Sequence, residues 1–407
     1  MFPLSPLPKN ADAEVRAIKV AQASPDRRLA VFSAAHFAVD LCCIFLMSAI
    51  AFPASAGKMP WAVCVLTYNF FAFAVQLPVG AFCDVMRRPR ELAATGCGLV
   101  SLAFLVAHFT QAPVLTGIVA GLGNSCFHVG GGVDTLNQCG GRAERPGIFV
   151  ATGAFGVYLA GKLAGLSGIS LPGTIAGIVL MMICAYAILS LERSEEAEST
   201  CEANEESGET LDVSGKAAPI SSSAAVICSV LLFVTVLLRS YCGHLMAWSW
   251  KAVPLLGLIF TCGVVLGKMA GGIIGDRIGW EKSSIISLGL AGVLFSFAPS
   301  SAAAGIVGVF LFNMSMPITL TALARIMGRN LYGTAFGLTT IALFMGTVPS
   351  TTGTPAFLVS PPGWLLTALT CLSLAAILGG ITPVRKLPSK REDGSEDRER
   401  DPEERRG

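Results

Sequence analysis

Long stretches of apolar residues, almost free of charge, run through the whole chain and limit what it can fold into. Hydrophobic residues make up 53% of its 407 residues and charged residues 14%, whereas soluble domains carry about 25% charged residues. A helix of roughly 20 apolar residues spans a bilayer, and several of the stretches are at least that long. The sequence therefore predicts an all-α integral membrane protein that crosses the bilayer many times.

Twelve transmembrane helices are expected, six on each side of a polar linker. They cover residues 29–52, 61–83, 92–109, 113–137, 147–167 and 171–191, then 224–244, 253–275, 282–298, 303–326, 331–348 and 364–384. The ninth is short. The chain then divides into a tail (1–28), an amino-terminal six-helix half (29–191), an acidic flexible linker (192–223), a carboxy-terminal six-helix half (224–384) and a charged, disordered tail (385–407).

The Lys and Arg residues between the spans set the expected orientation, because positively charged loops remain in the cytoplasm. If the amino terminus is cytoplasmic, the outer connections contain only Lys58 and Lys251. Apart from Lys162, Arg239 and Lys268 inside the spans, the other basic residues lie in or beside the inner connections and in the tails, so both termini are expected in the cytoplasm. We expect the protein to reside in the plasma (inner) membrane.

Two inner connections resemble each other and suggest that the two halves are repeats. "PVGAFCDVMRRPR" follows the second span and "AGGIIGDRIGWEK" follows the eighth. Both contain glycine, three residues and aspartate, at Gly80 and Asp84 and again at Gly272 and Asp276. Glycine allows two helices to meet closely, and an aspartate at one helix end can bind the positive amino terminus of another. We expect a pair of contacts that close the cytoplasmic side, although a tight turn with a charged cap would give the same residues.

These loops resemble the signature loop of the major facilitator superfamily of transporters. The second copy follows the usual pattern through Gly272, Asp276, Arg277 and Gly279. The first copy has Val85 where a basic residue is usual and Arg87 where glycine is usual, but it keeps the basic Arg88. The resemblance covers residues 29–384. It implies a twelve-helix transporter in which the first, fourth, seventh and tenth spans line a central cavity.

Three further segments resemble the fosmidomycin-resistance branch of drug exporters in this superfamily. They are "AAHFAVDLCC" in the first span, "GLGNSCFHVGGGVDTLNQCGGR" in the fourth and "LLRSYCGH" in the seventh. The branch commonly has proline and then an acidic residue after the fourth-span histidine, where this chain has Val129 and Gly130. This likeness implies export of a drug-like molecule.

Several polar residues inside the spans are candidates for the transport site, because a charge within the bilayer is costly and is usually functional. His36 and Asp40 are four residues apart on the first span, and Asn124 and His128 are four apart on the fourth. This spacing places each pair on one helix face. We expect these four residues to carry protons or contact the substrate in the cavity; a buried aspartate held as a structural tie is the alternative.

The remaining charges inside the spans have different expected roles. Asp134 faces away from His128 and is expected either to join the cytoplasmic gate with Asp84 or to pair with Arg142 or another loop arginine. The resemblance implies that Arg239 on the seventh span faces the same cavity as Asp40 and His128, where it would bind an anion or the deprotonated aspartate. Lys162 and Lys268 are expected to extend to the membrane surface.

Glycines in two of the spans carry separate expectations. A stripe at every fourth residue of the eighth span, from Gly263 to Gly275, predicts close helix packing. Gly130, Gly131 and Gly132 follow His128, and they would loosen the fourth span and allow it to bend.

The sequence thus predicts a secondary active transporter of a small organic molecule, with proton-coupled efflux by antiport and alternating access. Uptake of a small anionic metabolite by proton symport is the alternative, and an enzyme or a non-transporting receptor is more distant.

No phosphate-binding loop of the form G-x-x-x-x-G-K-[ST] is present, which argues against ATP as the energy source. The 13 cysteines form no C-x-x-C pair, so no metal or cofactor is expected. The expected partners are substrate, protons and lipid, without nucleic acid, and the chain is expected to act as a monomer.

Overall fold

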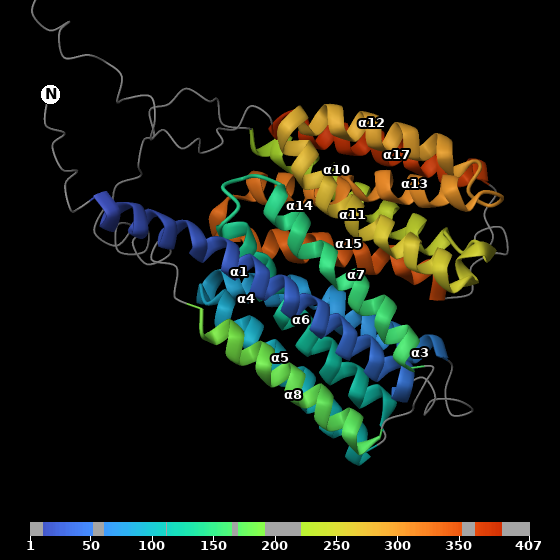
Figure 1. Cartoon of the computed structure of the whole chain (residues 1–407). Coiled ribbons are helices and arrows are strands. Elements are labelled where there is room, and N and C mark those ends of the chain that lie inside the picture. Colours follow the sequence, from blue (N-terminus) through green and yellow to red (C-terminus); the bar gives the residue numbers. More distant parts are fainter. Residues whose placement is uncertain are drawn as a thin grey trace, which may run out of the picture.

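The computed structural model describes residues 11–51, 61–110, 112–164, 170–191, 221–351 and 363–384. Residues 1–10, the whole predicted carboxy-terminal tail (385–407) and nearly all of the predicted acidic linker lie outside these residues. Figure 1 shows the described helices in two groups, the amino-terminal half from blue to green and the carboxy-terminal half from yellow to red. The described part of the chain is therefore all-α and built from two helical halves, as the sequence predicts.

The amino-terminal half supplies six spans. The first is α1 (Ala11–Leu46), which continues into a π-helical turn at Met47–Ala51. The second joins α3 (Trp61–Asn69), a π-helical turn (Phe70–Ala74) and α4 (Gln76–Met86). The other four are α5 (Pro89–Thr110), α6 (Pro113–Asn137), α7 (Glu144–Ala164) and α8 (Leu171–Leu189). Helix α1 begins well before the predicted start of the first span, so part of the polar amino-terminal tail is helical.

The carboxy-terminal half repeats this arrangement. Its first two spans are α10 (Ser222–Leu245) and α11 (Pro254–Ile278), joined through a short 3-10 turn at Ser249–Ala252. They are followed by α12 (Trp280–Phe295), the pair α13 (Ala302–Asn313) and α14 (Ser315–Met327), α15 (Tyr332–Thr351) and α17 (Gly363–Ile381). A turn at Arg329–Leu331 precedes α15.

Eleven helical segments in the described part of the chain are long and apolar enough to cross a membrane. The twelfth helix of the bundle is α12, which has only 16 residues and corresponds to the short ninth span. The tenth span combines α13 and α14 as Ala302–Met327. The predicted count of twelve therefore agrees with the two six-helix halves.

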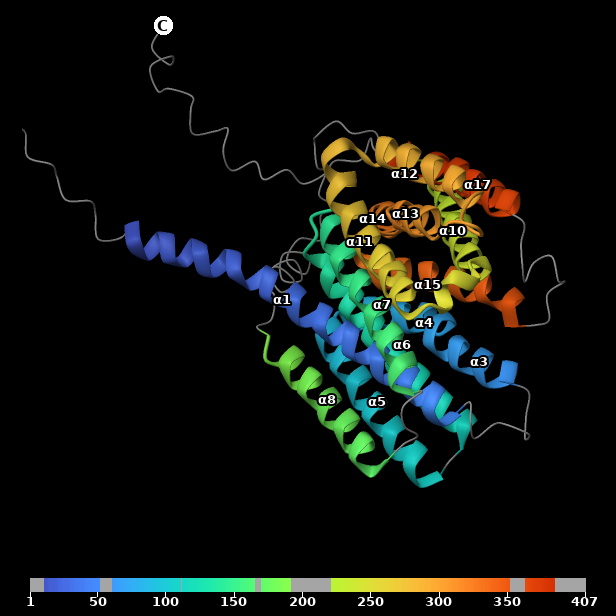
Figure 2. The same cartoon turned by 45° about the vertical axis from the view of Figure 1, so that its right-hand side comes forward.

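The two halves meet mainly through α11 and α15 of the carboxy-terminal half. Helix α11 packs against α7, and α15 packs against α4 and α6; Figure 2 shows these helices at the centre of the molecule. Glycines permit this approach. A Cβ atom on Gly80 would lie 2.1 Å from the Gly333 carbonyl oxygen, and one on Gly272 would lie 2.4 Å from the Ala143 carbonyl oxygen. Larger residues at these positions would push the halves apart.

Glycines on α11 and α6 also allow close packing. A Cβ atom on Gly267 or Gly271 would lie 2.2 or 2.1 Å from a backbone oxygen of the tenth span, so the predicted close contact along this stripe is confirmed.

The three consecutive glycines of α6 contact three different neighbours. A Cβ atom added to Gly130 would contact Pro89, one added to Gly131 would contact Phe149, and one added to Gly132 would contact Phe336. Helix α6 runs without interruption through them. They therefore serve close helix packing, and the helical hydrogen bonding is not broken there.

Candidate functional site

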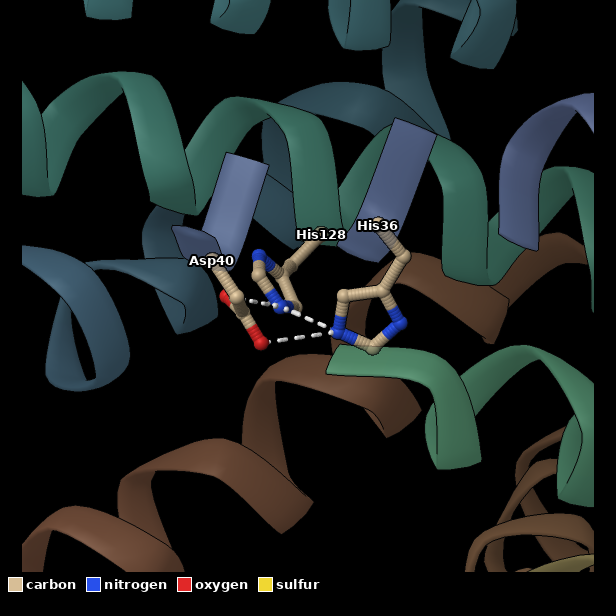
Figure 3. Close-up of side chains that lie close together, drawn as sticks. All are labelled: His36, Asp40 and His128. Atoms are coloured by element: carbon tan, nitrogen blue, oxygen red, sulfur yellow. Dashed lines mark hydrogen bonds and ion pairs between the residues drawn. The ribbon is translucent and has the colours of Figure 1, made fainter. Parts of the chain in front are cut away.

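His36, Asp40 and His128 form one cluster between α1 and α6, and Figure 3 shows their side chains converging. The Nε2 atoms of His36 and His128 are 2.9 Å apart. Asp40 Oδ2 lies 3.3 Å from His36 Nε2, and Asp40 Oδ1 lies 3.5 Å from His128 Nε2. Both imidazoles are buried, with 5% and 8% of their residue surface exposed. We call these three residues the triad.

The hydrogen bonds of the two imidazoles determine how many protons the triad holds. His36 Nδ1 donates to the carbonyl oxygen of Phe149 at 2.7 Å, and His128 Nδ1 donates to that of Asn124 at 2.9 Å. A carbonyl oxygen can only accept, so both Nδ1 atoms carry hydrogen. The 2.9 Å contact between the two Nε2 atoms then requires a third hydrogen between them. Two neutral imidazoles carry only two, so a hydrogen bond between the Nε2 atoms would form only when the pair holds one additional proton beside Asp40.

Two neighbouring residues shape the triad without belonging to it. Asn124 Nδ2 donates to Asp40 Oδ1 at 3.2 Å, so Asn124 and His128 both reach Asp40, as their spacing predicts. Asn124 is buried and is not among the residues that line the described cavity, unlike its predicted position. Gly153 on α7 lies against the opposite side. A Cβ atom there would be 2.1 Å from Asp40 Oδ2 and 2.5 Å from His36 Nε2. Sequence reasoning gave Gly153 no place in the site, because only its contact with α1 reveals it.

The triad forms one wall of a cavity of about 160 Å³ between the two halves. The cavity is lined from both halves, and its apolar side chains include Phe73, Val150, Val236, Leu320, Phe336 and Leu343. Arg239 from α10 and Lys268 from α11 also line it. Asp40, His128 and Arg239 therefore share one cavity, as the resemblance implies. Lys268 does not extend to the membrane surface, so that prediction is wrong; Lys162 is exposed.

The two cations have few partners. Arg239 is 6% exposed, and its Nη1 atom has no hydrogen-bond partner among the described residues. Lys268 Nζ donates to the carbonyl oxygen of Val150 at 3.0 Å, a bond that crosses between the halves. Asp40 is the only carboxylate that lines the described cavity. Two cationic side chains, Arg239 and Lys268, therefore face a single carboxylate across the described cavity lining.

The donor atoms of the triad lie within 4.8 Å of one another, which is close enough for three ligands of one divalent ion. Two observations favour a proton instead. The 2.9 Å separation of the Nε2 atoms is the usual length of a hydrogen bond between nitrogens. Arg239 and Lys268 face the same cavity, and their charges oppose a bound cation.

Asp84 joins the two halves at their cytoplasmic ends. Its carboxylate accepts hydrogen bonds from the backbone N–H groups of Gly333 at 2.6 Å and Thr334 at 2.8 Å. The Thr334 hydroxyl donates to it as well, at 2.7 Å. These groups belong to the first turn of α15, where unpaired N–H groups and the helix dipole favour a negative charge.

Asp276 makes the equivalent contact in the opposite direction. Its carboxylate accepts from the backbone N–H groups of Ala143 at 3.0 Å and Glu144 at 2.9 Å, at the start of α7. The Trp280 indole also donates to it at 2.9 Å. Each aspartate therefore binds the amino terminus of a helix in the other half, and the contact predicted from the repeated loops is present twice.

The residue three positions after each aspartate ends its helix. Gly279 has φ of 95° and Arg87 has φ of 53°, both in the region that favours glycine. The two turns nevertheless differ, because ψ is 31° at Arg87 and 140° at Gly279. Arg88 and Arg277, which were assigned to the gate, are exposed and make no side-chain hydrogen bond within the described part of the chain.

Asp134 does not join the contacts between the halves. It is buried and forms an ion pair with Arg28 of α1, and the Gln138 side chain also donates to it. All three residues lie on or next to α1 and α6, and none belongs to the carboxy-terminal half. Its assignment to the gate is therefore corrected, and its partner is Arg28 rather than Arg142. Arg142 instead lies 3.1 Å from Glu144.

Two six-helix halves around a central cavity, tied together by paired contacts at one end, define a membrane transporter. The sequence profile of the Major Facilitator Superfamily matches residues 29–351. The chain belongs to this superfamily, and this membership points to a transporter of small substrates rather than an enzyme. A search among curated proteins gives no match.

Solved structures agree with this fold. An Escherichia coli fucose:proton symporter has a TM-score of 0.54 and 13% identity, over 90% of this chain and all of that chain. A human organic anion transporter has a TM-score of 0.62 and 11% identity, over 87% and 99%. A bacterial homologue of the iron transporter ferroportin, in an outward-facing state, has a TM-score of 0.51 and 17% identity, over 88% and 99%. At these identities the likeness shows the fold alone.

Proposed function

We propose that the chain is a proton-coupled transporter of a small organic molecule and that the triad carries the coupled proton. The observation that supports this most directly is the 2.9 Å contact between the Nε2 atoms of His36 and His128. Both Nδ1 atoms already donate to carbonyl oxygens, so the contact needs one exchangeable proton. A neighbouring carboxylate stabilises that proton, and imidazole is the side chain that titrates near neutral pH.

Loss of this proton would disrupt the triad. Without it, two Nε2 lone pairs face each other beside the negative charge of Asp40, so the imidazoles repel and separate. The other ionisable groups around the triad are Lys268 and Arg239 across the cavity and the buried Tyr68 and Cys43. The two cations favour release of the proton, and the carboxylate favours its retention.

The triad is connected to the cytoplasmic gate through α7. His36 binds the carbonyl oxygen of Phe149, and Asp276 binds the amino terminus of the same helix at Glu144. A change in the proton on the triad therefore acts on a helix whose end is held by the other half. We propose that Asp84 and Asp276, with Gly80 and Gly272, close the cytoplasmic side and release it during alternating access.

The direction of transport has two candidates. Efflux by exchange with protons is supported by the sequence likeness to the fosmidomycin-resistance branch. Cotransport of an anion with a proton is supported by the uncompensated Arg239 and Lys268 in the cavity. In either case we place the activity in the plasma (inner) membrane, with the chain acting as a monomer.

Proton flux in proteoliposomes tests the coupling. A panel of labelled small organic compounds is first screened for uptake that depends on the protein. Each transported compound is then added outside vesicles without a gradient, and the external pH is recorded. A rise indicates cotransport and a fall indicates exchange.

Variants identify the proton site in the same experiment. Asp40→Asn and His128→Ala should abolish the pH change, whereas His108→Ala and His244→Ala, both outside the cavity lining, should retain it. Protein-dependent uptake without any pH change in the parent would refute proton coupling. An unaltered pH change in both triad variants would refute the triad as its site.

A further inference from the structure

We infer that Arg239 and Lys268 form a binding site for the acid group of a small organic anion, and that this anion moves together with the proton of the triad. The inference rests on the proton-coupled transport proposed above and specifies its substrate class and direction. Neither residue is part of the triad or of the cytoplasmic contacts. They approach the cavity from α10 and α11 of the carboxy-terminal half, opposite α1 and α6.

Arg239 is the group that most requires a ligand. A guanidinium group keeps its charge in proteins, yet this one is 6% exposed and its Nη1 atom has no partner in the described structure. A buried charged donor without a partner costs more than an ordinary missing hydrogen bond. A carboxylate or sulfonate in the cavity would supply the acceptor, and the planar guanidinium can hold two of its oxygens at once.

Lys268 supplies a second positive group from the neighbouring helix. Its ammonium group has three donors, and one of them is used by the Val150 carbonyl oxygen. The remaining donors are available to an anion in the cavity. An anion bound to Lys268 would therefore also affect the hydrogen bond from Lys268 to Val150. Val150 is adjacent to Phe149, whose carbonyl oxygen binds His36. Substrate and proton would act on the same short segment of α7.

The charges lining the cavity determine how proton and anion influence each other. With the additional proton, the imidazole pair balances Asp40, and Arg239 and Lys268 leave two positive charges without counter-charge. Without the proton, the negative charge of Asp40 cancels one of these. An anion is therefore attracted more strongly to the protonated state. By reciprocity, the bound anion also strengthens proton binding.

Mutual strengthening favours cotransport over exchange. Exchange requires that proton and substrate compete for the carrier, so that one leaves when the other binds. A cation would compete with the proton in this cavity, but an anion does the opposite. The geometry therefore supports movement of the anion with its proton in the same direction, rather than the drug efflux that the sequence likeness suggests.

The volume of the cavity and its apolar lining indicate the size and polarity of the rest of the substrate. The cavity measures about 160 Å³, below the roughly 300–1,000 Å³ of sites for drug-sized ligands. Apolar side chains from both halves surround the two cations, among them Phe73, Phe336 and Leu343. This environment fits a small acid with a short apolar or aromatic body.

Thermal stabilisation of the purified protein tests the anion site. The probes are benzoate, benzenesulfonate, phenylacetate and butyrate, each paired with its uncharged amide. We expect at least one acid to bind with a dissociation constant at least about tenfold below that of its amide. Arg239→Gln and Lys268→Met should remove this preference, Lys268→Arg should retain it, and Lys162→Met, on the exposed end of α7, should have no effect.

The outcomes separate this inference from proton coupling. Equal binding of every acid and its amide, or an unchanged preference in Arg239→Gln, would refute the anion site. Addition of a bound acid to proteoliposomes should raise the external pH in the parent and not in Asp40→Asn; a fall would refute cotransport. Acid binding that depends on Arg239 without any pH change would leave the anion site in place and refute the coupling.

Discussion

Gly153→Ala is the most direct test of the triad, because it adds a single methyl group against the carboxylate. The new Cβ atom would lie 2.1 Å from Asp40 Oδ2 and 2.5 Å from His36 Nε2, whereas ordinary contacts begin at 3.4 Å. The carboxylate must therefore retreat by more than 1 Å. Its 3.3 and 3.5 Å contacts with the two imidazoles would lengthen beyond the range of an ion pair. The pair would then lose the negative charge that stabilises its additional proton.

The same substitution should change the stability of the fold only slightly. Crowding a packed site costs about 1–3 kcal/mol, but replacement of glycine by alanine inside a helix returns about 1 kcal/mol. The unfolding free energy should fall by no more than about 2 kcal/mol, the difference of these two terms. Gly161→Ala is the matched control on α7, because a Cβ atom there meets nothing within 4 Å. It should leave stability unchanged or slightly increased.

Nitrogen NMR of labelled histidine provides the measurement. The chain has only four histidines, and His108→Gln with His244→Gln leaves the two of the triad. The parent and Gly161→Ala should show one shared proton on the Nε2 atoms near neutral pH. In Gly153→Ala the signals should become those of two neutral imidazoles, and the proton should return only at lower pH. If Gly153→Ala is folded and keeps the spectrum and pH dependence of the parent, the proposed role of Asp40 is wrong.

Two further predictions concern the contacts outside the triad. Arg28→Ala leaves Asp134 buried without its cation and should lower the unfolding free energy in detergent by about 3–5 kcal/mol. Arg145→Ala is the control, because its partner Asp26 is exposed, and it should cost less than about 1 kcal/mol. Equal losses in the two variants would contradict this prediction. Asp84→Asn should separate the cytoplasmic ends of α4 and α15, because a neutral amide lacks the charge that binds the α15 amino terminus. Distances between spin labels on the two helices measure this separation. An unchanged distance distribution would contradict the gate.

Local sequence patterns predicted the features that depend on one helix or one loop. Hydropathy gave the twelve spans, and the repeated glycine and aspartate motif gave both cytoplasmic contacts. The four-residue spacing correctly placed His36 beside Asp40. All three depend on residues close together in sequence, where helix geometry alone fixes the neighbours.

Contacts between helices could not be predicted in the same way. The meeting of His36 and His128 depends on how α1 and α6 rotate about their axes, which one sequence does not specify. The same uncertainty explains the errors. Lys268 is expected at the surface but lines the cavity, and Asn124 is expected in the cavity lining but is buried against Asp40. The partner of Asp134 was missed because Arg28 appeared to belong to a polar tail.

The two cytoplasmic contacts are alike in geometry but should differ in their response to pH. Asp276 holds α7, and the same helix is bound by His36 at Phe149 and by Lys268 at Val150. Asp84 holds α15, whose described cavity-lining residues are Phe336, Thr339, Thr340 and Leu343, none of which titrates. Proton loss from the triad should therefore loosen the Asp276 contact first.

This asymmetry gives a testable difference between two otherwise equivalent substitutions. Distances across the cytoplasmic ends of α7 and α11 should change with pH in the parent and in Asp84→Asn. In Asp276→Asn the ends should already be separated, and the distance should no longer respond to pH. The two variants remove the same charge from the same kind of contact, so general destabilisation would affect both alike. An equal loss of pH response in the two would show that the proton acts on the whole cytoplasmic side rather than through α7.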